Sequence, residues 1–412
     1  MSKIRPFRGY RPRPELAAKV ASFPYDVLNS DEARELVKGN EYSFLHVGKP
    51  EIDLPPGVPL YDDRVYAKGV ENLRRFIEDG VLQKEAKACL YVYQQKMGEH
   101  VQAGLVALCS VKEYEGRLIK KHEFTRKDKE DDRTRHVMEQ NANAEPVFLT
   151  YRSRSPIDEV VNRVRTTDPI YDFVSEDGIG HTVWVMGDDE DVGTLEAEFE
   201  NVPALYVADG HHRTAAAVRT GQALRKKSAT HTGDEPFEYF MAVVFPHDQL
   251  QIMDYNRVVK DLNGFTPDEF REKIREKFEI SPADAPSPDT AKKFGMFLEG
   301  EWVRLKAKDG TFPADDPVKG LDVSILQENL LAPVLGIGDP RTDDRIDFVG
   351  GIRGTSELEK RVNNGWAVAF ALYPTSIDQL LEVADAGKVM PPKSTWFEPK
   401  LRSGLVVRLI ED

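Results

Sequence analysis

Short apolar runs alternate with helical patterns through the first two thirds of the chain. Runs rich in β-branched, aliphatic and aromatic residues predict β-strands at residues 90–95, 101–111, 117–119, 147–151, 182–186, 202–208 and 239–245. The polar residues 96–99 between the first two runs predict a hairpin turn. Apolar residues from Val70 to Ile77 recur at helical spacing, and Gly80 ends that predicted helix. A shorter helix is predicted from Ser30, as its N-cap, through Leu36.

Two capping boxes mark helices in the last third of the chain. Thr266 pairs with Glu269 around a proline at the first helical position, and Ser376 pairs with Gln379. A further helix and three strands are predicted at residues 322–334, 301–307, 366–373 and 404–410. Because helices and strands do not alternate strictly, the sequence predicts an α+β, or mixed α/β, fold.

The composition is that of a globular protein with a real core. The 412 residues are 40% apolar and 31% charged, and we expect two regions, 1–264 and 265–412. No apolar run is long enough to span a membrane and no apolar signal segment begins the chain, so we expect a cytoplasmic protein without a membrane partner. The net charge of −14 argues against a nucleic-acid partner, since phosphate neutralisation needs basic residues. Cys89 and Cys109 lie in apolar runs and are expected to be buried free thiols. Nothing in the sequence indicates an oligomeric state.

The strongest candidate for chemistry is the segment Asp209-Gly210-His211-His212-Arg213. It joins an apolar strand to an alanine-rich helix that we expect to end near Gly221. Glycine permits a tight turn, and the first turn of a helix offers free N–H groups with a partial positive charge. An arginine there adds a two-pronged donor for phosphate oxygens, and a strand-end aspartate is placed to hold Mg²⁺ or accept a proton. The segment therefore predicts a phosphate-binding site.

Two other interpretations of this segment stay open. The first is structural, with Asp209 capping the helix and the two histidines exposed on the surface. The second is a transition-metal site. Adjacent histidines seldom chelate one ion by themselves, but His122 and Glu123, which follow the predicted strand at 117–119, extend the set of ligands.

The run Ala208 to Ala217 resembles the signature of the "domain of unknown function 1015" family. The resemblance extends over nearly the whole chain and includes, in order, the segments 24–27, 122–125, 129–133, 254–257 and 391–397. The central motif is also similar to that of the ParB/sulfiredoxin-like superfamily, whose members place such a loop at a helix start on nucleotide phosphates. That resemblance implies a nucleotide-binding core with additional N- and C-terminal α/β elements.

The wider superfamily includes free serine kinases, so the resemblance implies an ATP-dependent phosphotransferase of a small hydroxyl amino acid. The implied acceptor is free L-serine, giving O-phospho-L-serine for cysteine biosynthesis, with Mg²⁺ and ATP and with ADP or CTP as alternative donors. The chain contains neither a Walker A loop nor the catalytic loop of protein kinases, so it belongs to neither of those classes.

Phosphoryl transfer needs phosphate ligands, a metal and a proton acceptor, and the candidate residues are assigned to these roles or to the substrate. The predicted phosphate and nucleotide ligands are Gly210, His211, His212, Arg213, Lys129, Arg133, Lys393, Ser394 and Thr395. Glu123 is the preferred proton acceptor, Asp209 is the second choice and the Mg²⁺ ligand, and His211 is a further acid–base candidate. Asp26 and His122 are assigned to the substrate, although an aspartate in that position can equally stabilise a turn.

Two other functions compete with a kinase. A regulatory protein of ParB-like type would bind the nucleotide without catalysis. A metal-dependent hydrolase would use His122, His211 and His212 as ligands.

Overall fold

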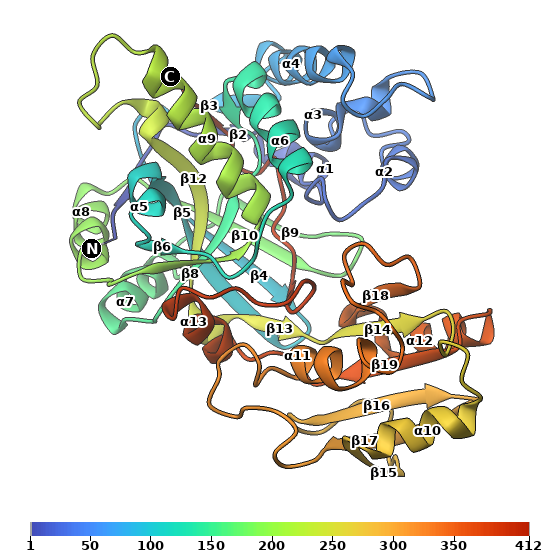
Figure 1. The fold of residues 1–412 in the computed structure, drawn as a ribbon. Coiled ribbons are helices and arrows are strands. Elements are labelled where there is room, and N and C mark those ends of the chain that lie inside the picture. The colour runs from blue at the N-terminus through green and yellow to red at the C-terminus, as the bar shows by residue number, and fades with distance from the viewer. Residues whose placement is uncertain (1, 412) are drawn as a thin grey trace. The chain divides into compact units, whose positions relative to one another are not determined.

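The computed structural model describes residues 2–411, which fold as two compact units (Figure 1). The first unit contains the chain up to Leu250 together with the residues from Pro399 onward, and the second contains Gln251–Glu398. This division differs from the predicted regions 1–264 and 265–412. Both units combine helices with strands, so the predicted mixed α/β class is confirmed.

Strand pairing explains the different division. The strand β14 (Tyr255–Val259) forms its ladders with β18 (Ile346–Gly350) and β19 (Val368–Leu372), so it belongs with the second unit. The short strand β21 (Arg408–Leu409) pairs with β7 (Ala142–Asn143), which returns the end of the chain to the first unit. Both pairings join segments far apart in the sequence, and no local pattern specifies them.

A mixed sheet of nine strands forms the centre of the first unit as far as residues 2–411 describe it. Its order is β6-β11-β8-β12-β5-β4-β10-β9, with β1 paired to β5. The strands are β1 Ile4–Arg5, β4 Leu90–Met97, β5 His100–Ser110, β6 Ile119–Lys120, β8 Val147–Tyr151, β9 Tyr171–Val174, β10 Gly180–Met186, β11 Leu205–Asp209 and β12 Tyr239–Pro246. A separate pair joins β2 Tyr10–Pro12 to β3 Leu82–Lys84. The predicted hairpin is confirmed as β4 and β5.

The directions of three neighbouring strands bring distant segments to one edge of this sheet. Strand β6 runs parallel to β11, so both end at the same edge. Strand β8 runs antiparallel to β11, so it begins where β11 ends. The residues after β6, the residues after β11 and the residues before β8 therefore meet at this edge, which carries the candidate site.

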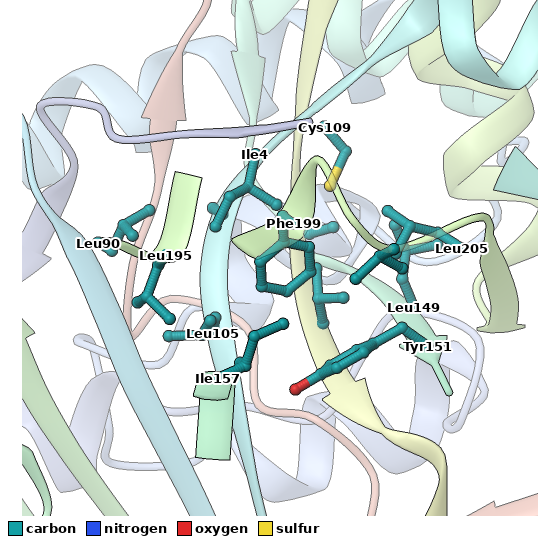
Figure 2. Close-up of a cluster of buried hydrophobic side chains, with 14 of the residues drawn as sticks. Ile4, Leu90, Leu105, Cys109, Leu149, Tyr151, Ile157, Leu195, Phe199 and Leu205 are labelled. Atoms are coloured by element: carbon teal, nitrogen blue, oxygen red, sulfur yellow. The ribbon is translucent and has the colours of Figure 1, made fainter. Parts of the chain in front are cut away.

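The helices of the first unit cover the sheet and enclose its core. They are α1 Ala17–Val20, α2 Ser30–Leu36, α3 Leu45–Gly48, α4 Asp63–Glu78, α5 Val111–Glu115, α6 Lys127–Gln140, α7 Ser155–Val164, α8 Asp189–Phe199 and α9 His211–Lys227, with 3₁₀ turns at Pro14–Leu16, Pro50–Asp53, Pro236–Glu238 and His247–Gln249. Figure 2 shows Ile157 of α7 and Phe199 of α8 among buried sheet residues such as Leu105 and Tyr151. Helix α6 packs along α9 and thereby against the element that carries the motif (Figure 1).

Two local predictions in this unit needed correction. Asn29 rather than Ser30 caps α2, and it forms a capping box with Glu32. Helix α9 does not end near Gly221 but continues to Lys227. A β-carbon at Gly221 would lie 2.7 Å from the carbonyl oxygen of Phe237, so this glycine permits close packing and does not end the helix.

The second unit is an antiparallel sheet of six strands, in the order β15-β17-β16-β19-β14-β18, with helices packed on it. Its remaining elements are β13 Gln251–Met253, α10 Pro267–Arg275, β15 Phe278–Pro282, β16 Lys293–Leu298, β17 Glu301–Ala307, α11 Asp322–Leu326, a π-helical turn Gln327–Leu331, a 3₁₀ turn Gly351–Arg353, α12 Gly354–Asn363, α13 Ile377–Asp385 and β20 Trp396–Glu398. Both predicted capping boxes, at Thr266 and Ser376, are confirmed. The strand predicted over 404–410 is correct only for the two residues of β21.

Cys89 and Cys109 are buried free thiols, as predicted. Among the described residues, no helix combines the length and the apolar character needed to cross a membrane.

Candidate functional site

The motif forms a sharp turn from strand β11 into helix α9. The pairing of β11 with β8 is irregular between Val207 and Asp209, and Gly210 adopts a left-handed conformation with φ of 82°. A β-carbon at Gly210 would lie 2.9 Å from Nε of Arg213, so glycine is required for both conformation and space. No side chain caps the N-terminus of α9. Its first N–H groups are therefore available to an anion.

Asp209 does not cap the helix, which removes the purely structural interpretation of that residue. Its Oδ1 accepts a hydrogen bond from the N–H of Gly210 at 2.9 Å, and its Oδ2 accepts one from Nζ of Lys400 at 3.3 Å. Burial opposes the charge of this carboxylate, but Lys400 and Arg213 outweigh burial and hold its pKa below the ordinary value. Asp209 is therefore an ionised, half-buried carboxylate.

Arg213 is the buried cation of the site. Its Nη1 donates to the carbonyl oxygen of Pro146 at 2.6 Å, and its Nη2 lies 3.8 Å from Oδ2 of Asp209 and 3.9 Å from Oδ2 of Asp26. Burial alone lowers the pKa of the guanidinium, but these carboxylates and Glu145 raise it above the usual value. Its Nε is buried and has no hydrogen-bond partner. Arg213 is therefore positively charged, and its Nε–H is available to donate a hydrogen bond.

Two charged residues of this site were missed by the sequence analysis. Lys400 comes from the returning C-terminal segment, and Glu145 lies two residues before the first residue of β8. Oε1 of Glu145 accepts hydrogen bonds from the N–H of Tyr25 at 3.0 Å and from Oγ of Ser403 at 3.4 Å. Burial raises the pKa of Glu145, against the effect of Arg213 and of another buried arginine. The carboxylate of Glu145, followed by a proline just before an apolar strand, was a sequence signal for one of these residues, whereas Lys400 had none.

A small cavity lies beside these residues, behind the start of α9. Its volume is about 40 Å³, and Arg133, Glu145 and Arg213 contribute charged groups to its wall. A water molecule needs roughly 10–15 Å³ in this measure, so the cavity accommodates a few ordered waters. The cavity is too small to hold a nucleotide.

His122, Glu123 and His211 form a cluster at the same edge of the sheet. The imidazole rings of His122 and His211 meet edge to face with centroids 4.5 Å apart, and Nδ1 of His211 lies 3.8 Å from Oε2 of Glu123. Burial lowers the pKa of His122 to about 4 and holds that of His211 well below its usual value, so both rings are neutral at pH 7. Both ring nitrogens of His122 and Nε2 of His211 are buried and make no hydrogen bond of normal geometry, although the backbone of Val207 lies close enough to His122 to raise its pKa. The structure therefore brings together three of the residues that the sequence offered as an alternative set of metal ligands.

The other predicted ligands of the first unit lie in different environments. His212 is half-buried, and its Nε2 accepts a hydrogen bond from the N–H of Arg126 at 3.1 Å. Nζ of Lys129 lies 5.8 Å above the ring of Tyr61. Arg133 is mostly buried, 2.7 Å from Asp132 and donating to the carbonyl oxygen of Gly48 at 3.2 Å. Arg133 is thus an internal residue, whereas Lys129 is partly exposed.

Lys393, Ser394 and Thr395 belong to the second unit. The hydroxyl of Ser394 donates to the carbonyl oxygen of Pro391 at 2.6 Å, and the carbonyl of Lys393 accepts a hydrogen bond from Arg257 at 2.9 Å. These contacts hold a tight loop, in which Lys393 has a φ of 58°. A role for this loop in phosphate binding stays a prediction.

The solved structures that resemble this chain share little sequence identity with it. A solved structure described as "Free serine kinase in complex with AMP" matches with 13% identity and a TM-score of 0.36, over 73% of this chain and 91% of that one. "SbnI with C-terminal truncation from Staphylococcus aureus" matches with 12% identity and a TM-score of 0.40, over 74% and 87%. A conserved hypothetical protein from Pyrococcus furiosus matches with 13% identity and a TM-score of 0.35, over 74% and 95%. No curated protein matches the chain. The family model described as "Protein of unknown function (DUF1015)" matches residues 4–324, and the chain belongs to this family.

Proposed function

We propose that this protein is an ATP-dependent phosphotransferase that phosphorylates the hydroxyl group of a small amino acid. Free L-serine is the proposed acceptor and O-phospho-L-serine the product, which would enter cysteine biosynthesis in the cytoplasm. The observation that carries the proposal is the uncapped N-terminus of α9, entered through the left-handed Gly210 and flanked by the buried Arg213. The likeness of the motif to the ParB/sulfiredoxin-like superfamily supplies the choice of a kinase and of serine.

The phosphates of the nucleotide would bind at the first turn of α9. The N–H groups of His211 and His212 point out of the helix end, and the helix dipole favours negative charge there. Arg213 has a free Nε–H and a permanent charge, both suited to phosphate oxygens. Mg²⁺ with ATP commonly needs only one or two protein carboxylates, and the ionised Asp209 meets that requirement.

Transfer joins the serine hydroxyl oxygen to the γ-phosphorus as the bond to the bridging oxygen of ADP breaks. The hydroxyl proton must pass to a base, which we assign to Glu123. Its side chain is 41% exposed, so it can reach a bound substrate, and it lies 3.8 Å from the neutral ring of His211. Asp209 is the poorer base because Lys400 and Arg213 keep its pKa low.

The decisive experiment is phosphorus NMR of the protein with ATP, Mg²⁺ and L-serine, and with serine omitted as the control. A phosphoserine signal that appears only with serine supports the kinase. Nucleotide binding without product supports the regulatory alternative, and ADP formation without serine supports a hydrolase. Because lost electrostatic stabilisation commonly costs about 10²-fold or more, Arg213→Ala and Asp209→Asn should each lower the rate by at least that factor.

Two further variants make the assignment specific. Glu123→Gln should lower turnover and leave ATP affinity, measured by calorimetry, nearly unchanged. Arg219→Ala is the matched control on α9, because this arginine is partly exposed and pairs with Glu130 and Asp131 rather than with Asp209 or Asp26. Equal rates for Arg213→Ala and Arg219→Ala, with both proteins folded, would refute the site.

A further inference from the structure

The buried nitrogens of His122 and His211 make no hydrogen bond of normal geometry within the protein, although the backbone of Val207 lies close to His122. His122 is only 1% exposed and His211 7%, and three of their four ring nitrogens are buried without a normal hydrogen bond. Buried polar atoms in folded proteins nearly always have a partner, and the exceptions concentrate at sites for ions, waters or substrates. The proposed phosphate site does not use His122, so that site does not account for this histidine.

The third member of the cluster supplies a carboxylate at a suitable distance. One donor atom from each of His122, Glu123 and His211 lies within 4.8 Å of the others, and the measured pair Nδ1 of His211 and Oε2 of Glu123 is 3.8 Å apart. Ligands about 2.0–2.1 Å from a common tetrahedral ion lie roughly 3.4 Å from one another. Small side-chain rotations therefore bring all three atoms onto one ion.

We propose that His122, Glu123 and His211 bind a divalent transition-metal ion. Two imidazole nitrogens and one carboxylate suit ions such as Zn²⁺, Mn²⁺, Fe²⁺ or Co²⁺, whereas Mg²⁺ and Ca²⁺ prefer oxygen ligands. Three protein ligands leave at least one coordination position open, which is typical of sites that bind water or a substrate oxygen. This site is distinct from the Mg²⁺ proposed at Asp209. It shares Glu123 with the proposed kinase, but metal binding can be measured without kinase activity.

The charges around the cluster are compatible with a cation. The carboxylate of Asp209 lies near enough to act on both histidines, and Glu123 adds a second negative charge. Lys121 is the opposing cation that acts on His211. Asp209 is also paired with Lys400 and Arg213, so Glu123 is the carboxylate that the cluster itself contributes to a cation.

One other group of residues in the described chain offers comparable ligands and provides the control. His231, Glu235 and Glu238 also lie close together. There, however, Glu238 is already paired with Arg225, at 2.5 Å, and its oxygen accepts a hydrogen bond from that arginine. The side chain of His231 is 38% exposed, so its replacement should leave the fold intact.

The test uses Co²⁺ as the probe on the full-length protein after removal of metals with a chelator. We expect saturable binding of one Co²⁺ per chain, seen as visible d–d absorption, that persists in a hundredfold excess of Mg²⁺. Glu123→Gln should weaken Co²⁺ binding by about tenfold or more, in line with the usual effect of losing a ligand or its support. His122→Asn should abolish it, and His231→Gln should leave it unchanged.

Several results would overturn the site. These are no saturable binding by the wild-type protein, displacement by Mg²⁺, loss of binding in His231→Gln, or unchanged binding in a folded Glu123→Gln variant. Circular dichroism establishes folding of each variant, and Glu123→Gln remains informative if the buried His122→Asn variant does not fold. Cobalt binding and serine phosphorylation are measured separately, so failure of one leaves the other intact.

Discussion

The ion pair between Asp209 and Lys400 tests whether the returning C-terminal segment builds the site. Nζ of Lys400 lies 3.3 Å from Oδ2 of Asp209, and the side chains are 12% and 30% exposed. A double-mutant cycle with Asp209→Asn, Lys400→Met and the double variant isolates the energy of this pair, because each single change removes one charge at similar volume.

The expected magnitude follows from the distance. Two unit charges 3.3 Å apart attract by about 5 kcal/mol at an effective dielectric constant near 20. Desolvation of both groups offsets part of this attraction, and Arg213, 3.8 Å from the same oxygen, shares the carboxylate. We therefore expect a coupling free energy of about 2–3 kcal/mol, within the range that close, desolvated charge pairs give.

The assay is urea unfolding at pH 7 of the four proteins, followed by circular dichroism. The pair Lys87–Asp189 is the matched control, since its atoms are also 3.3 Å apart but its side chains are 62% and 98% exposed. Exposed pairs give about 0–1 kcal/mol, so the control cycle should give a value near the lower end of that range. The reasoning fails if both cycles give the same coupling, because burial would then contribute nothing to the Asp209–Lys400 pair.

Two more predictions concern the turn and a distant histidine. Gly210→Ala forces a left-handed alanine against Arg213, so we expect a loss of about 1–2 kcal/mol in unfolding free energy, with weaker ATP binding by calorimetry. A variant that binds ATP as the wild type does would contradict the role of this turn. Burial and Arg402 lower the pKa of His181 to about 3, so the unfolded chain takes up a proton on this histidine at pH 5 while the folded chain does not. Stability from this group is complete above the unfolded pKa of about 6.5 and falls by about 2 kcal/mol between pH 7 and pH 5. The unfolding free energy of His181→Gln should lack this share of the slope, and parallel pH profiles would refute the assignment.

The sequence was informative wherever a local pattern determines the structure. The hairpin of β4 and β5, the two capping boxes and the strand-turn-helix of the motif were all predicted, because each depends on residues within a few positions of one another. The placement of His122 after a strand was also predicted. Its meeting with His211 follows from the parallel pairing of β6 with β11, which the sequence alone did not specify.

The residues that the sequence analysis missed depend on long-range pairing. Lys400 and Asp209 are separated by 191 positions, and the C-terminal segment reaches the site because β21 pairs with β7. Gly221 in the sequence predicts a helix end, but in the structure it permits close contact with Phe237, so α9 is longer than predicted. In both cases the structure depends on contact with a segment further away in the sequence. The residues within a few positions of each element do not indicate that contact.

The charges around Arg213 explain how the start of α9 can carry buried charged groups and still have N–H groups available to an anion. Burial raises the pKa of Glu145, whereas Lys400 and Arg213 hold that of Asp209 low despite burial. As pH falls, Glu145 therefore takes up a proton before Asp209 does, so the carboxylate nearer the helix end keeps its charge. Asp209 turns that charge toward Lys400 and the N–H of Gly210. The remaining N–H groups of α9 are not occupied by a side-chain cap, and this is the condition that phosphate binding at a helix N-terminus requires.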